Sequence, residues 1–201
     1  MIQNYIFDFG KVLVHFEPDD MTAACAKDPE AAAQISPVVF DRLYWDPLDR
    51  GGITDEEVKT ACHARLPEHL HALADEVYDR WMEHLPFIAG MPQLVQDIKA
   101  AGGKLFLLSN ISVSFAENWH KVPQLKAFLS QFDGLVFSGP LGIVKPSREI
   151  FQHVLDTYGL KAEESIFIDD SEKNIVGSEK AGIRGYLFDG DPVKLRAALG
   201  F

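Results

Sequence analysis

Three short apolar segments of this chain each end in polar side chains, and this pattern restricts the fold more than any other feature. The segments are residues 3–7 before Asp8, residues 104–108 before Ser109 and Asn110, and residues 165–168 before Asp169 and Asp170. A carboxylate at the end of a buried strand is costly unless a partner or ligand uses it. Because the carboxyl ends of parallel strands meet at one edge of a sheet, where ligands bind, we expect these groups to share one crevice.

From Pro92 onward the chain alternates helical and extended patterns. Leu94, Val95 and Ile98 have helical spacing, and two glycines after them mark the helix end. Further strands are expected at residues 134–137 and 185–188, with helices beginning near residues 147 and 192. This alternation predicts an α/β fold with a doubly wound, parallel, Rossmann-like sheet.

Residues 15–86 contain no convincing strand and are expected to form short helices. Thr54 followed by Glu57 has the spacing of a capping box, which predicts a helix starting at residue 55. Another helix is expected over residues 70–84. We therefore expect an α/β core made of residues 1–14 and 87–201, with residues 15–86 inserted as a small helical cap above the strand ends.

Composition excludes several classes of protein. The net charge of −11 over 201 residues argues against nucleic-acid binding, which usually needs a basic face. No segment approaches the ~20 apolar residues that span a bilayer, and the amino terminus does not resemble a signal peptide. Cys25 and Cys62 are not in a close pair, which fits a reducing cytoplasm. We expect a cytoplasmic monomer or homodimer.

Each polar motif has an ordinary structural interpretation when it stands alone. Asp8 before Gly10 is also typical of a strand-to-turn acid, and Ser109 with Asn110 is typical of a turn. Asp169 and Asp170 indicate more, because adjacent acids repel each other unless a cation lies nearby. The order of the motifs along the chain carries more information than any one of them.

In that order the motifs resemble the haloacid dehalogenase-like hydrolase superfamily over essentially the whole chain. The matching stretches are Ile6-Phe7-Asp8-Phe9-Gly10, Leu107-Leu108-Ser109-Asn110, Val144-Lys145-Pro146 and Ile168-Asp169-Asp170 with Asn174 four positions on. Within this superfamily the chain is similar to bacterial phosphatases of sugar 1-phosphates, on residues 49–56, 145–155 and 174–177. The helical insertion resembles the small cap of that branch.

The resemblance implies a Mg²⁺-dependent phosphatase that hydrolyses small phosphate monoesters, in particular sugar phosphates. Asp8 would be the nucleophile and would form an aspartyl phosphate, while Ser109 and the Asn110 backbone bind phosphoryl oxygens. Lys145 would supply a positive charge to Asp8 and to the phosphate. The implied Mg²⁺ ligands are the Asp8 side chain, the Gly10 carbonyl and Asp170, with Asp169 assisting directly or through water and Asn174 holding the water shell.

One position departs from the usual superfamily pattern. Many of its phosphatases carry a second aspartate two residues after the nucleophile as general acid and base, whereas this chain has Gly10, as the sugar-phosphatase branch does. General acid catalysis contributes roughly 10²–10⁴-fold, so esters with good leaving groups, such as sugar 1-phosphates, should be preferred. His15 could replace the missing acid, although a solvated histidine is the more common role for such a residue.

Substrate selection is expected to lie in the cap. Trp45 and Arg50 are the expected contacts, with Tyr44, Asp49 and Trp119 as further residues that could reach the crevice. Packing in the core is the ordinary alternative for each aromatic side chain.

Two other functions remain open. A 2-haloacid dehalogenase could use Asp8 without a metal, but the Asp169-Asp170 pair would then repel an anionic substrate. A phosphate-binding module impaired in catalysis by Gly10 is the second alternative.

Overall fold

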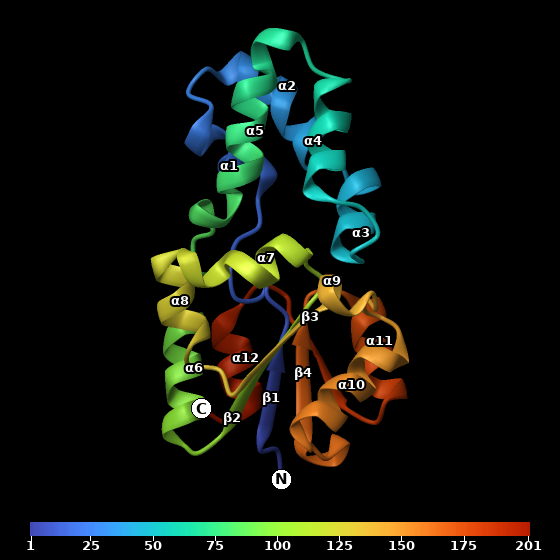
Figure 1. Ribbon diagram of the computed structural model, residues 1–201. Helices are drawn as coiled ribbons and strands as arrows, with labels where there is room; N and C mark the ends of the chain where they lie inside the picture. Colours follow the sequence, from blue (N-terminus) through green and yellow to red (C-terminus); the bar gives the residue numbers. More distant parts are fainter.

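A five-stranded parallel sheet forms the centre of the molecule, which the computed structural model describes over residues 1–201 (Figure 1). The strands are β1 (Asn4–Phe7), β2 (Lys104–Ser109), β3 (Gly134–Phe137), β4 (Ser165–Asp169) and β5 (Arg184–Leu187). Their order across the sheet is β3-β2-β1-β4-β5, and every neighbouring pair is parallel. The predicted α/β fold with a doubly wound parallel sheet is confirmed.

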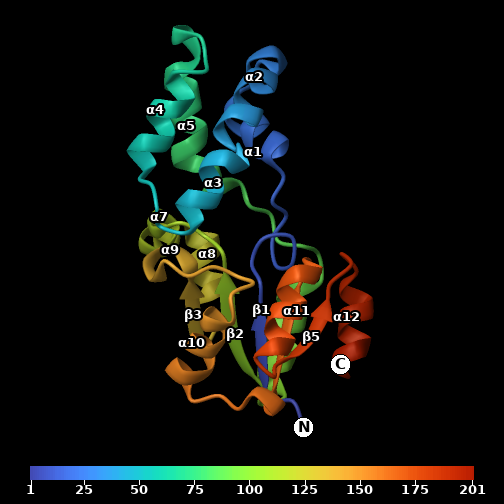
Figure 2. The same cartoon turned by 90° about the vertical axis from the view of Figure 1, so that its right-hand side faces the viewer.

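Helices cover both faces of this sheet (Figures 1 and 2). One face packs against α6 (Met91–Ala100), α8 (Pro123–Leu129) and α12 (Pro192–Leu199), and the other against α10 (Arg148–Tyr158) and α11 (Glu172–Lys180). Neighbouring residues of β1 point to opposite faces, so Phe7 joins the first cluster and Ile6 the second. Burial on both faces explains why the central strands have almost no polar residues before their ends.

Several short helices were not expected from the sequence. Three of them flank β3: α7 (Val113–Asn118), the one-turn η3 (Trp119–Lys121) and α9 (Ser138–Leu141), and a further turn, η4 (Ala162–Glu164), precedes β4. Elements of three to six residues are too short for an apolar periodicity to be read. α7 and η3 lie in the segment after β2, and α9 directly follows β3. Both α7 and α9 lie at the edge of the sheet where the polar motifs meet (Figure 1).

A helical insertion, residues 18–84, lies beyond the carboxyl ends of the strands (Figure 1). It consists of α1 (Pro18–Cys25), α2 (Pro29–Val39), α3 (Arg42–Asp49), α4 (Asp55–His63), η1 (Glu68–Leu70), α5 (His71–Arg80) and η2 (Trp81–His84). Its entering and leaving chains are hydrogen-bonded, from the His15 amide to the Pro86 carbonyl at 2.8 Å and from the Ile88 amide to the Leu13 carbonyl at 3.0 Å. The predicted Thr54–Glu57 capping box is present at the start of α4.

An aromatic contact series joins the insertion to the core. The Trp45 and Trp81 rings lie 5.3 Å apart, and Trp81 stacks on Phe115 of α7 at 5.7 Å. Paired aromatic rings of this kind add about 0.5–1.5 kcal/mol each beyond the area they bury. None of the helices combines the length and the apolar character that a bilayer span needs.

Candidate active site at the carboxyl ends of the strands

The strand register brings the two motif aspartates side by side. Phe7 of β1 lies opposite Ile168 of β4, and the Asp8 amide donates to the Ile168 carbonyl at 2.9 Å. The next residue along each strand is an aspartate, so Asp8 and Asp169 are neighbours at the same edge. Ser109 ends β2 on the other side of β1.

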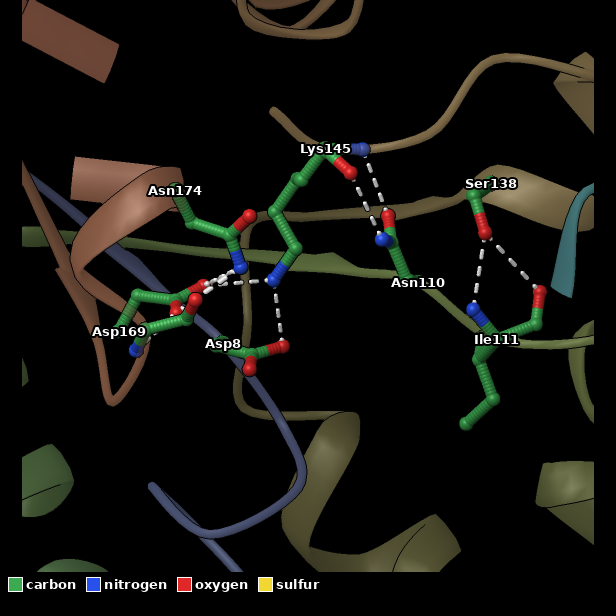
Figure 3. A network of polar contacts seen from close by, with 8 residues as sticks. Asp8, Asn110, Ile111, Ser138, Lys145, Asp169 and Asn174 are labelled. Atoms are coloured by element: carbon green, nitrogen blue, oxygen red, sulfur yellow. Dashed lines mark hydrogen bonds and ion pairs between the residues drawn. The ribbon is translucent and has the colours of Figure 1, made fainter. Parts of the chain in front are cut away.

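Lys145 lies between the two carboxylates (Figure 3). Its Nζ is 2.7 Å from Asp8 Oδ1 and 2.8 Å from Asp169 Oδ2, and only 1% of its side chain is exposed. Burial alone would lower the pKa of this ammonium, but Asp8 and Asp169 outweigh it, so the pKa is raised and the charge is kept. The lysine therefore provides a fixed positive charge at the strand ends.

The Asn110 side chain holds the Lys145 backbone in place. Its Oδ1 accepts from the Lys145 amide at 2.8 Å, and its Nδ2 donates to the Lys145 carbonyl at 3.1 Å (Figure 3). This use of the amide leaves only the Asn110 backbone for a ligand. The hydroxyl of Ser109, in contrast, has no protein partner and lines the cavity.

The pKa of Asp8 is raised to about 7 in the absence of a bound cation. Burial is the main cause, with the negative charge of Asp169 adding to it, while Lys145 opposes both. An additional positive charge would favour the carboxylate form that a nucleophile requires. The side chain therefore has the environment expected of a group that acts together with a cation.

Asp169 is fully buried, and both of its oxygens are engaged. They accept from Lys145, from the Ser171 amide at 2.8 Å and from Asn174 Nδ2 at 3.0 Å to each oxygen. The other end of that amide, Asn174 Oδ1, is buried without any hydrogen-bond partner. A buried unpaired oxygen of this kind costs about 1–3 kcal/mol unless a donor or a hydrated ion uses it.

Three carboxylates could hold a metal ion here. Ligand atoms of Asp8, Asp169 and Asp170 all lie within 4.8 Å of one another. Asp170 is the exposed member, and its pKa is raised by burial of the carboxyl and then by Asp169. Gly10 lies in the same cavity wall. An all-oxygen set with an unpaired amide oxygen nearby fits a partly hydrated Mg²⁺.

A cavity of about 280 Å³ opens over these groups. Its floor, as we use the term, is formed by Asp8, Ser109, Asn110, Lys145, Asp170 and Asn174. Its roof is formed by Phe16, Arg42, Trp45, Asp49 and Trp81. The floor is polar and charged, whereas the roof presents three aromatic rings with one cation and one acid.

Only part of the predicted substrate contacts line this cavity. Trp45 does, although its ring is also packed and its N–H donates to the Val39 carbonyl at 2.6 Å. Arg50, Tyr44, Trp119 and His15 do not line the cavity, and Arg50 is exposed beyond the end of α3.

Arg42 and Asp49 are the α3 residues that join Trp45 in the roof. Positions 42, 45 and 49 share one face of a helix, because residues three, four and seven apart lie on the same side. Arg50 is one position later and is turned away. The spacing would have identified Arg42 from the sequence if the bounds of α3 had been known.

Two basic residues at the cavity wall were also missed. Lys11 follows β1 and Lys173 lies in α11, and both line the cavity. Lys11 has a φ of 61°, the only positive value at a residue other than glycine. Such strain often accompanies functional loops, but nothing in the sequence marks this lysine as special.

The chain matches known proteins over most of its length. The sequence model of the haloacid dehalogenase-like hydrolase family matches residues 39–187. Sesquiterpene phosphatase astK of Aspergillus oryzae is 25% identical over 183 residues, which are 90% of this chain and 86% of the relative. D-ribitol-5-phosphate phosphatase of Bacteroides thetaiotaomicron is 26% identical, over 89% of this chain and 88% of the relative. Drimenol cyclase drtB of Aspergillus calidoustus is longer, and the chain spans 34% of it.

Solved structures show the same fold. The HAD family enzyme bt-2542 of Bacteroides thetaiotaomicron, in complex with magnesium and inorganic phosphate, matches with a TM-score of 0.70 and 21% identity, over 92% of this chain and 93% of that chain. A dehalogenase structure also matches with a TM-score of 0.70, at 19% identity, over 92% of this chain and 83% of that chain. The fold is therefore shared by an enzyme that binds magnesium and phosphate and by a dehalogenase, so the side chains of the site must distinguish the two functions.

Proposed function

This chain belongs to the haloacid dehalogenase-like hydrolase family, and on that premise we propose a Mg²⁺-dependent phosphatase that acts on small phosphate monoesters through an aspartyl phosphate. The enzyme class, phosphoric monoester hydrolase, is confirmed by the family match and the phosphatases among its relatives. The observation that carries the finer proposal is the Asp8 carboxylate, paired with buried Lys145 at 2.7 Å and adjacent to two more acids.

In the proposed first step, Asp8 attacks phosphorus and the bond to the leaving oxygen breaks. Lys145 favours the ionised form of Asp8 and stabilises charge on the phosphoryl group. The free hydroxyl of Ser109 is available to donate to a phosphoryl oxygen. Mg²⁺, bound by Asp8, Asp170 and the Gly10 carbonyl, would offset the repulsion between carboxylate and phosphate dianion.

In the second step, water attacks the phosphorus of the aspartyl phosphate and releases inorganic phosphate, which regenerates Asp8. Asp169 keeps Lys145 and Asn174 in position during both steps through its hydrogen bonds. The unpaired Asn174 Oδ1 faces a buried polar region, where it could accept from water of the cation's hydration shell.

We further propose that residues 15–86 act as a substrate-selecting cap and that sugar phosphates are the substrates. The aromatic rings of Phe16, Trp45 and Trp81 offer flat apolar surfaces, and Arg42 offers a cation beside them. Sugar rings stack on such surfaces with their C–H faces while their hydroxyls bind polar groups. A prenyl phosphate is the competing substrate, suggested by the sesquiterpene phosphatase relative.

The two alternative functions make different use of the same residues. A 2-haloacid dehalogenase needs Asp8 but no cation, and Asp170 would then repel the substrate carboxylate. A phosphate-binding module would keep Lys145 and Ser109 while lacking turnover. The acid pair and the unpaired Asn174 oxygen favour the metal-dependent reaction.

One assay separates these three functions. The purified protein is incubated with an aryl phosphate, a sugar 1-phosphate, a prenyl phosphate and 2-chloropropionate, each with Mg²⁺ and with EDTA. Release of phosphate that EDTA abolishes and Mg²⁺ restores is expected. Release of chloride in EDTA would support a dehalogenase, and binding of phosphate without any turnover would support the module.

A further inference from the structure

The floor of the cavity offers no evident proton donor to a leaving group. The position two residues after Asp8 is Gly10, and His15 lies outside the cavity. Asp169 has both oxygens occupied by hydrogen bonds, and Asp170 belongs to the proposed metal ligands. Among the acids that line the cavity, this leaves Asp49 in the roof to serve as a donor to an alkoxide leaving group.

Asp49 is the acid in the roof. It is only 7% exposed, it lines the same cavity as Asp8, and its carboxyl group has neither a hydrogen bond nor an ion pair within the protein. The other two buried aspartates, Asp8 and Asp169, both pair with Lys145. Asn174 Oδ1 is the only sealed side-chain oxygen or nitrogen without a partner, so the carboxyl oxygens of Asp49 are open to the cavity, where they are free to contact a ligand.

The backbone of Asp49 is fixed against the core. Its carbonyl accepts from the Ser138 hydroxyl of α9 at 2.5 Å. The same hydroxyl accepts from the Ile111 amide at 2.8 Å (Figure 3). Ile111 follows Ser109 by two residues, so this link ties the end of α3 to the loop that follows β2. The geometry of roof and floor is therefore coupled through Ser138.

Close packing of the following turn strengthens this attachment. Gly51 has a φ of +68°, and a Cβ at this position would lie 2.4 Å from the Gly139 carbonyl oxygen. Only glycine allows both the backbone angle and the close approach of the two chains. The turn after α3 is thus seated on α9, with Asp49 held over the strand ends.

Burial of the Asp49 carboxyl favours its neutral form. Four charged groups shift the pKa of this carboxyl. Arg42 and Asp46 belong to the same helix as Asp49, and Asp8 and Lys145 belong to the core. Burial raises the pKa of the Asp49 carboxyl to about 8, because Asp46 and Asp8 add to burial while Arg42 and Lys145 oppose it. Asp49 therefore carries a proton at neutral pH, as a donor must.

We propose that Asp49 protonates the leaving oxygen, and so replaces from the roof the acid that Gly10 lacks in the floor. This inference rests on the proposed phosphatase function. As the bond from Asp8 to phosphorus forms and the bond from phosphorus to the leaving oxygen breaks, the proton passes from Asp49 to that oxygen. The products are an alcohol, the aspartyl phosphate and the Asp49 carboxylate.

The second step returns the proton. The Asp49 carboxylate takes a proton from the attacking water while the hydroxide portion bonds to phosphorus and the bond to Asp8 breaks. Asp8 leaves as carboxylate, inorganic phosphate is released, and Asp49 is neutral again. No oxidant, reductant or further reactant is needed, and one residue serves as acid and then as base.

Leaving-group dependence of Asp49→Asn tests this role. For an alkyl phosphate, kcat/KM should fall about 10²–10⁴-fold, because the alkoxide needs the proton. For 2,4-dinitrophenyl phosphate, kcat/KM should change by less than about threefold, since its phenolate leaves without help, while phosphorylated enzyme accumulates during turnover. Asp20→Asn is the matched control, because Asp20 is an exposed acid of the insertion outside this cavity.

The pH profile gives a second readout that a purely structural residue would not change. For the alkyl phosphate, wild-type kcat/KM should decline above the pKa of the donor, and this basic limb should be absent in Asp49→Asn. Asp49→Glu, which retains a carboxyl, should recover part of the alkyl phosphate activity. Melting temperatures of all variants establish that they are folded.

Equal losses on both esters, or no loss on either, would overturn the assignment of Asp49 while leaving the phosphatase function intact. A wild-type protein that hydrolyses no phosphate ester with Mg²⁺ would instead overturn the proposed function itself. If Asp49→Asn shows no cooperative thermal unfolding, the same two esters are compared with the variants Asp49→Ser and Asp49→Glu.

Discussion

The buried aspartates at the floor and at the roof of the cavity differ in their hydrogen-bond partners. Asp169 is fully buried, accepts four hydrogen bonds, two of them from the floor residue Asn174, and shares Lys145 with Asp8. In the roof, Asp49 is 7% exposed and has no side-chain partner. The floor is thus organised before substrate arrives, as electrostatic catalysis requires, while the roof keeps polar capacity that a substrate can use.

The largest effect is expected in the floor, from Asp8→Asn. The amide cannot form the aspartyl phosphate, so turnover of an aryl phosphate should fall by at least roughly 10³-fold, as for other lost nucleophiles. Steady-state phosphate release measures this, and circular dichroism checks the fold. A folded variant with more than a few per cent of wild-type turnover would show that Asp8 is not the nucleophile.

Lys145→Met should remove the central charge of the floor. It leaves Asp8 and Asp169 facing each other without compensation, and breaking a buried ion pair in this way costs about 3–5 kcal/mol. Urea unfolding at neutral pH gives the loss in free energy. Lys173→Met is the control, since Lys173 also lines the cavity but forms no ion pair. Equal stability of the two variants would mean that the buried network is not stabilised by Lys145.

Asp170 and Asp169 should separate metal binding from structure. Asp170→Ala should raise the Mg²⁺ concentration needed for half-maximal activity by about 10–100-fold while the melting temperature changes little, because Asp170 is exposed. Asp169→Ala should weaken metal binding less and lower the melting temperature more, because it removes the acceptor of Lys145 and Asn174. A weaker dependence on Mg²⁺ for Asp170→Ala than for Asp169→Ala would mean that Asp169 is the more important metal ligand.

In the roof, Arg42→Ala should affect binding more than chemistry. KM for a sugar phosphate should rise about tenfold with kcat nearly unchanged, since remote contacts bind substrate and transition state alike. Arg50→Ala is the matched variant and should change KM by less than about twofold, because Arg50 is exposed outside the cavity. A larger rise in KM for Arg50→Ala would mean that Arg50 is the substrate contact, as the sequence predicted.

The last contrast concerns the dependence of stability on pH. The pKa of Asp49 is raised from 3.8 to about 8 by burial, so the folded protein binds more protons than the unfolded chain between these values. Stability from this group therefore falls as pH rises through that window. Asp49→Asn removes this slope, so the variant should gain stability relative to wild type between pH 5 and about pH 8 in urea titrations. A difference independent of pH would mean that Asp49 is already ionised in the folded protein.

Local sequence patterns account for the sheet and for most of the polar groups at the strand ends. The apolar strands ending in Asp8, Ser109 and Asp169 are local patterns, and parallel pairing places their ends at one edge without further information. The capping box at Thr54 and the helix starting after Ser147 are also local signals, and both are present. Each of these depends on residues within a few positions of one another.

The composition of the roof and the contacts of several side chains depend on tertiary packing. The Asn110 side-chain amide holds the Lys145 backbone, and this depends on a partner 35 positions away. Arg42 replaces Arg50 at the cavity because the phase of α3 is set by its packing on α9 through Ser138 and Gly51. Asp49 acquires its buried, unpaired state from that same docking. Helix phase and burial arise from contacts between distant segments, and a linear pattern of residue types does not contain them.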